Sequence, residues 1–99
     1  MTPVHNADIA RIFEEIADLL EIQEANPFRV RAYRNAARTV GDVRRDLAQA
    51  IAEGKPLPKL PGIGADLAAK IEEISKTGTT GLLEKLHKEL PPAITALLR

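Results

Sequence analysis

Hydrophobic side chains recur at intervals of three and four residues over much of the chain, which is the spacing of one face of an α-helix. The first apolar stripe consists of Ile9, Ile12, Phe13, Ile16, Leu19 and Leu20. It predicts a helix over residues 7–22, with Asn6 as the N-cap. A second helix is predicted to begin at Pro27, because proline suits the first helical turn, and to end at Gly41.

Further helices are expected over residues 43–53, 65–76 and 81–89, with a last short one over residues 93–99. The proline-rich residues 54–58 leave room for only one helical turn before residue 65, because proline lacks the amide hydrogen that a helix needs. No segment alternates in polarity as a half-buried strand would. The sequence therefore predicts an all-α fold, a compact bundle of four to six short helices that forms a single domain over residues 1–99.

Two glycines lie one residue apart in the segment LPGIG at residues 60–64, directly before a predicted helix. Glycine adopts positive φ readily and allows another backbone to come close. The first amides of the helix that follows have no intrahelical partner, and the helix dipole favours an anion there. The segment therefore predicts a phosphate-binding turn, and it resembles the helix-hairpin-helix motif of DNA-binding proteins.

The charges are unevenly distributed, although the net charge of the 99 residues is zero. Residues 1–27 contain six acids and one base, a balance of −5, whereas residues 28–59 contain eight bases and three acids, a balance of +5. A basic middle beside a backbone anion site would attract a polyanion, with the acidic first helix turned away from it. The alternative is that two solvated faces of opposite sign pack side by side.

Several kinds of chemistry find no support in the sequence. The absence of cysteine excludes disulfides and thiolate metal sites, and it is compatible with a reducing cytoplasm. His5 and His87 have no companions at metal-ligand spacing, and there is no Walker-type phosphate loop. The chain shows no leader segment and no apolar run of about 18 residues. We therefore expect a cytoplasmic protein without a membrane partner, and a monomer.

Four segments in this order and spacing together resemble the amino-terminal 8-kDa domain of family X DNA polymerases, most closely the bacterial members. They are NPFRVRAYRNAA at 26–37, LPGIG at 60–64, AAKIEEI at 68–74 and KTG at 76–78. The resemblance covers nearly the whole chain, and residues 91–99 resemble the approach to a second hairpin. The polymerase domain with its divalent metal ions has no room in 99 residues. The resemblance therefore implies one domain of a longer nucleotidyltransferase.

This resemblance implies binding to gapped or nicked duplex DNA during base excision repair, without sequence preference. It implies no cofactor within the domain other than a monovalent cation, Na⁺ or K⁺, held by the backbone carbonyls of Pro58, Leu60 and Ile63. The amides of Gly64, Ala65 and Asp66 are expected to contact phosphates. The full set of residues expected to bind DNA is Gly62, Ile63, Gly64, Ala65, Asp66, Arg29, Tyr33, Arg34 and Lys59.

Lys70 occupies the position of the lysine with which some members of this family remove a 5′-deoxyribose phosphate, through a Schiff base. It lies at the edge of the apolar face of its helix, where partial desolvation would favour the neutral, nucleophilic amine. The alternative is structural, because Asp66 lies four residues earlier, and an ion pair with it would keep Lys70 protonated.

Two positions depart from the pattern of the lyase-competent animal enzymes. Asp66 replaces a lysine and would repel a terminal phosphate, and Phe28 replaces a histidine. Tyr33 matches a residue of the 5′-phosphate pocket, or it packs in the core.

Besides DNA binding and lyase activity, a third hypothesis is that the chain is a helical protein-interaction module in which the hairpin is only a tight turn.

Overall fold

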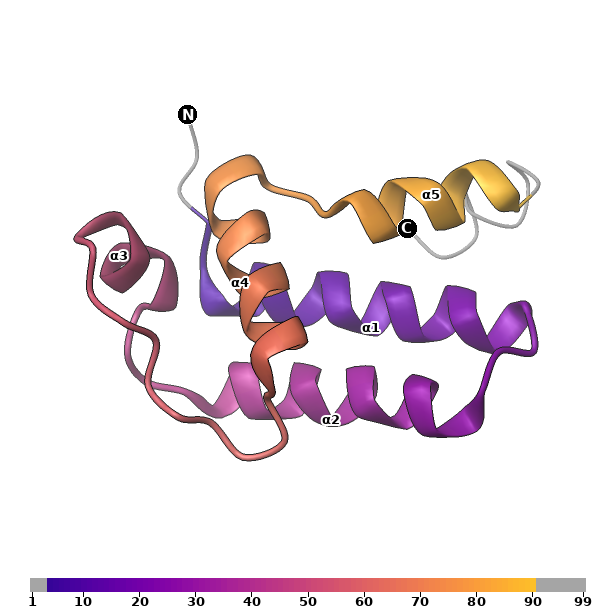
Figure 1. Ribbon diagram of the computed structural model, residues 1–99, viewed down its shortest axis with the longest axis horizontal. Helices are drawn as coiled ribbons and strands as arrows, with labels where there is room; N and C mark the ends of the chain where they lie inside the picture. The colour runs from indigo at the N-terminus through magenta and orange to yellow at the C-terminus, as the bar shows by residue number, and fades with distance from the viewer. Residues whose placement is uncertain (1–3, 91–99) are drawn as a thin grey trace.

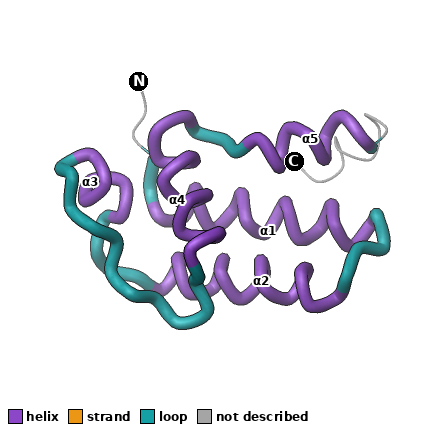
Figure 2. Tube along the Cα trace, viewed as in Figure 1, coloured by secondary structure: helices purple, strands orange, loops and turns teal. Residues whose placement is uncertain are grey.

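The computed structural model describes residues 4–90, and every regular element in that range is a helix (Figure 1 and Figure 2). The five helices are α1 (Asn6–Ile22), α2 (Pro27–Asp42), α3 (Leu47–Ala52), α4 (Ala65–Thr77) and α5 (Gly81–Glu89). The predicted all-α fold is therefore confirmed. The helix predicted over residues 93–99 lies outside the described residues. None of the described helices is long and apolar enough to cross a membrane.

The core forms where α1 and α2 pack side by side (Figure 1). Every member of the apolar stripe predicted for α1 is buried, and the most exposed of them, Ile12, is only 8% exposed. The ring of Phe13 on α1 meets the ring of Tyr33 on α2 edge to face, with centroids 5.7 Å apart and planes at 71°. Such an aromatic pair contributes more stability to a core than the burial of its apolar area alone provides. The two helices therefore form the base against which the other elements pack.

The remaining long helices attach to this base through one apolar face each. In Figure 1, α4 passes in front of α1 and α2, and α5 runs along the side of α1 that faces away from α2. The buried residues of these two helices are Leu67, Ile71 and Ile74 on α4 and Leu83 and Leu86 on α5.

Polar contacts fix the position of α5 along α1. The ring of His87 contacts the carboxylate of Glu15, and both side chains are largely buried. At the far end of the helix, Gln23 Nε2 donates a hydrogen bond of 2.8 Å to Glu89 Oε2.

Asn6 is not the N-cap of α1, contrary to the sequence prediction. The helix begins at Asn6 itself, and the Asp8 carboxylate accepts a hydrogen bond of 2.9 Å from the amide of His5, which precedes it. The Asn6 side chain is thereby free to reach the connection between α2 and α3. It donates to the carbonyls of Val43 (3.0 Å) and Arg45 (2.7 Å) and accepts from the amide of Leu47 (3.1 Å). One side chain therefore ties α1 to a segment about 40 residues away in sequence.

The helix predicted over residues 43–53 is shorter than expected, and the turn predicted before the hairpin does not form. α3 begins at Leu47 because the side chain of Asp46 accepts a hydrogen bond of 3.0 Å from the amide of Gln49, which caps the helix there. Residues 55–60 contain no helix. Prolines at positions 56 and 58 disfavour helical backbone in the residues before them, so this connection has no helix up to the hairpin.

Replacing Asn6 by alanine removes all three hydrogen bonds to the α2–α3 connection. Because the backbone groups left behind are partly buried, we expect Asn6→Ala to lower the free energy of unfolding by about 2 kcal/mol. Urea denaturation followed by circular dichroism measures this loss. Asn35→Ala is the matched control, since Asn35 is exposed on α2 and its side chain forms no hydrogen bond within the range 4–90. Equal stabilities of the two variants would contradict the role given to Asn6.

Candidate nucleic-acid interface

The hairpin is a four-residue turn, from Leu60 to Ile63, that delivers the chain into α4. The amide of Ile63 donates a hydrogen bond of 3.1 Å to the carbonyl of Leu60. Pro61 takes the second position of the turn, and Gly62 takes the third with φ of 76°. These are the features of a type II turn, whose third residue requires positive φ. The turn therefore depends on Gly62.

Gly64 has a different role from Gly62. It is the N-cap of α4, and its backbone is extended, with φ of −87° and ψ of −173°. Residues other than glycine adopt this conformation easily. A Cβ atom added at Gly64 would lie within 4 Å of no other atom outside its immediate neighbours. The fold therefore does not require glycine here, and the open space in front of position 64 is available to a ligand.

The first amides of α4 have no partner in the protein. Within residues 4–90, the amides of Gly64, Ala65 and Asp66 donate no hydrogen bond. No side chain caps α4, whereas α2, α3 and α5 each begin with a polar side chain that accepts from a backbone amide. Unpaired amides at the positive end of a helix dipole form a suitable anion site. The structure thus gives the predicted phosphate-binding turn its geometry.

Contacts with α2 hold the hairpin in place. The hydroxyl of Thr39 donates to the carbonyl of Pro61 at 3.3 Å.

Arg29 is exposed on α2, one helical turn before Tyr33, and Lys59 is exposed just before the hairpin. Neither Arg29 nor Lys59 forms an ion pair with another described residue. Both basic side chains are therefore free to meet an anion.

Arg34 is held by the acidic face of α1. Its Nη1 lies 3.1 Å from a Glu14 carboxylate oxygen and 3.0 Å from Asp18, and its Nη2 lies 3.2 Å from Glu21. Burial lowers the pKa of Arg34, but the hydrogen bonds to Asp18 and Glu21 outweigh it and raise that pKa above its ordinary value. A guanidinium shared among three carboxylates attracts a phosphate only weakly. We therefore leave Arg34 out of the proposed DNA-binding face.

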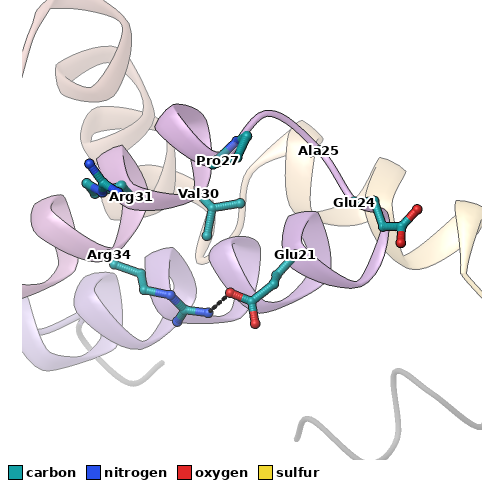
Figure 3. A pocket seen from close by; sticks show the side chains of 7 residues that line it. All are labelled: Glu21, Glu24, Ala25, Pro27, Val30, Arg31 and Arg34. Carbon is teal, nitrogen blue, oxygen red and sulfur yellow. Dashed lines mark hydrogen bonds and ion pairs between the residues drawn. The ribbon is translucent and has the colours of Figure 1, made fainter.

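The ion pair of Arg34 with Glu21 borders a pocket of about 570 Å³ at the turn between α1 and α2 (Figure 3). The pocket is lined by Glu21, Glu24, Ala25, Pro27, Val30, Arg31 and Arg34. Because its two acidic side chains balance its two basic ones, the pocket does not favour a polyanion.

Tyr33 packs in the core. Its side chain lies edge-on to Phe13, and the residue is only 3% exposed. This placement favours the packing role over the 5′-phosphate pocket.

Lys70 forms an ion pair with Asp66. Its Nζ lies 3.1 Å from Asp66 Oδ1, and its side chain is 18% exposed. Burial lowers the pKa of Lys70, but the hydrogen bond and charge of Asp66, with a contribution from Tyr33, raise that pKa above its ordinary value. The ammonium form is thereby favoured at neutral pH. A protonated amine is not a nucleophile, so the geometry favours the structural alternative over the catalytic one.

The backbone carbonyls expected to bind a cation lie at the hairpin. The Leu60 carbonyl already accepts the hydrogen bond that closes the turn, and the carbonyls of Pro58 and Ile63 accept none from residues 4–90. A carbonyl oxygen has two lone pairs, so Leu60 retains one for a ligand. Neutral oxygen donors of this kind fit a hard monovalent cation. In the described part of the chain, no group of three or more histidine, aspartate or glutamate side chains is arranged so that it could hold a metal ion.

Comparison with known proteins places this fold and hairpin in a family. Residues 4–80 match the helix-hairpin-helix domain family, and the chain belongs to that family. The chain is also 35% identical over 96 residues to the DNA polymerase/3'-5' exonuclease PolX of Bacillus subtilis (strain 168). The match covers 97% of this chain and 16% of that protein, in its amino-terminal part, so the chain spans about a sixth of the relative's length. The resemblance inferred from the motifs is confirmed.

The different roles of the two hairpin glycines predict different costs of substitution. Gly62→Ala forces a Cβ into positive φ, so we expect it to lower the free energy of unfolding by about 1 kcal/mol. Gly64→Ala introduces neither backbone strain nor a steric clash, so it should change the free energy of unfolding by less than about 0.5 kcal/mol. Chemical denaturation of the two variants in parallel provides the comparison. Equal destabilisation by both would mean that the backbone of the hairpin differs from the one described.

Proposed function

We propose that this domain binds gapped or nicked duplex DNA without sequence preference and positions it for a family X polymerase. Membership of the helix-hairpin-helix family supports DNA binding in general. The observation that carries the finer proposal is the uncapped start of α4. The amides of Gly64, Ala65 and Asp66 have no partner among the described residues, and a Cβ atom added at Gly64 would meet no neighbouring atom.

The chemistry of this site explains why no sequence preference is proposed. Backbone amides contact phosphate oxygens, which are the same in every nucleotide, so they fix the register of DNA without reading its bases. Arg29 and Lys59 are exposed and unpaired within the described range, and they add charge that any sequence satisfies. A monovalent cation on the hairpin carbonyls would join these contacts to the DNA backbone.

Nucleotidyl transfer and its divalent metals belong, in this proposal, to another part of such a polymerase. The PolX relative is a DNA polymerase about six times as long as the match. We propose that the domain acts there as a monomer in the cytoplasm, holding one side of a repair intermediate.

We expect Gly64→Val to weaken binding to a gapped duplex about tenfold, because the branched side chain fills the space that a phosphate needs. Fluorescence anisotropy with a labelled gapped duplex, repeated over a range of salt concentrations, measures the affinity. The affinity of the natural sequence should fall steeply as salt rises, through counterion release.

The controls separate this proposal from its alternatives. An unbroken duplex and a single strand of the same sequence test the preference for gaps, and a thermal melt shows whether Gly64→Val is still folded. Unchanged affinity in the folded variant would remove the hairpin from the interface. An affinity for DNA that does not change with salt concentration, or no binding at all, would favour a protein-interaction module.

Lyase activity through Lys70 is the alternative function that the ion pair with Asp66 disfavours. We therefore expect borohydride to trap little or no covalent adduct on gapped DNA that carries a 5′-deoxyribose phosphate. Gel electrophoresis under denaturing conditions detects the adduct, and Lys70→Ala is run in parallel. An adduct formed by the natural sequence and lost in Lys70→Ala would establish the lyase instead.

A further inference from the structure

We infer that Lys70 serves the hairpin as the counter-ion of Asp66 and keeps that carboxylate from repelling a phosphate docked on the α4 amides. The inference rests on the DNA-binding function proposed above. It makes Lys70 a positioning residue, because it acts on the DNA through Asp66.

The need for a counter-ion follows from where Asp66 lies. It belongs to the first turn of α4, and its own amide is one of the unpaired donors at the phosphate site. Its side chain is 82% exposed, so solvent and ligand both reach it. An acidic residue in the first turn stabilises the helix itself. The same charge opposes any phosphate that approaches the amides.

Lys70 is suited to neutralise this charge. It lies one helical turn after Asp66, with the acid before the base, which is the favourable order for such a pair. The two side chains differ in exposure, 18% for the lysine against 82% for the acid. Exposed ion pairs contribute little, largely because two flexible side chains must be ordered. Here packing has already ordered the lysine, so its ammonium stays beside the carboxylate.

The core supports this arrangement through Tyr33. Its ring is fixed edge-on against Phe13, and it also contributes to keeping Lys70 protonated. Tyr33 of the α1–α2 core thus helps to keep Lys70 protonated, and the Lys70 ammonium pairs with the carboxylate at the hairpin. Asp66 forms no ion pair with any other cation in residues 4–90, so Lys70 alone in that range balances it.

A double-mutant cycle tests the inference, with binding of the whole chain to a labelled gapped duplex as the measurement. We expect Lys70→Ala to weaken binding about fivefold, because it leaves the Asp66 charge unbalanced beside the phosphate. Asp66→Asn should strengthen binding about twofold, since it removes the repulsion. In the Asp66→Asn background, Lys70→Ala should weaken binding by a clearly smaller factor, because no carboxylate then holds the ammonium at the hairpin. Lys70→Arg should restore most of the natural affinity.

Lys76→Ala is the matched control. Lys76 lies in the last turn of the same helix, is exposed, and forms no ion pair with a residue in the described range. It removes the same charge away from the hairpin, and thermal melts of all variants verify that each is folded.

Two results would overturn the inference. If Lys70→Ala weakens binding by the same factor with and without the Asp66 charge, Lys70 contacts DNA directly. If Lys70→Ala behaves like Lys76→Ala, the pair has no part in binding. The Gly64→Val variant distinguishes these results from failure of the proposed function, because full affinity in that variant would show that DNA does not bind at the hairpin.

Discussion

The edge-to-face contact between Phe13 and Tyr33 lies at the centre of the α1–α2 interface, and much of the candidate site depends on it. Burial of Tyr33 fixes the rotation of α2 about its axis. Arg34, the next residue along the helix, is thereby directed to the carboxylates of α1, while Tyr33 itself lies beside Lys70 of α4. The packing of the apolar face of α2 against α1 thus determines where Arg34 finds its partners. The core also influences the charges at the hairpin, because the buried Tyr33 helps to keep Lys70 protonated.

This arrangement also resolves the charge pattern of the chain. The acidic residues of α1 and the basic residues of α2 partly cancel where the two helices meet, because Arg34 binds three of the acids. The alternative of two oppositely charged faces that pack side by side therefore holds in part. Arg34 and Lys55 of the basic segment form ion pairs within the fold, whereas Arg29 and Lys59 remain exposed without an ion pair among the described residues. Net charge alone would have missed this division.

The hairpin shows how two similar residues acquire different functions. Gly62 is needed by the chain itself, since its φ of 76° closes the turn. Gly64 has ordinary backbone angles and free space around it, so the fold itself does not require glycine at this position. The distinction matters because only a glycine that the fold does not need can be tested for a role in binding without disturbing stability.

The sequence alone determined the features that depend on neighbours along the chain. Apolar spacing placed α1, α2, α4 and α5 within one or two residues of their observed ends, and glycine and helix-start chemistry identified the hairpin. The ion pair of Lys70 with Asp66 was also accessible, because both residues lie on one helix at a fixed spacing.

Only the tertiary structure decided the features that depend on distant contacts. The sequence predicts Asn6 as a helix cap, but its side chain forms hydrogen bonds with residues 43–47. It predicts Arg34 as a DNA contact, but Arg34 forms ion pairs with acidic residues of α1. α3 ended up shorter than its apolar pattern suggested, because capping by Asp46 prevailed over propensity. Helical spacing specifies which face of a helix is apolar, whereas the partners of its polar side chains are set by how the helices pack. That packing is a property of the whole chain, and no local pattern contains it.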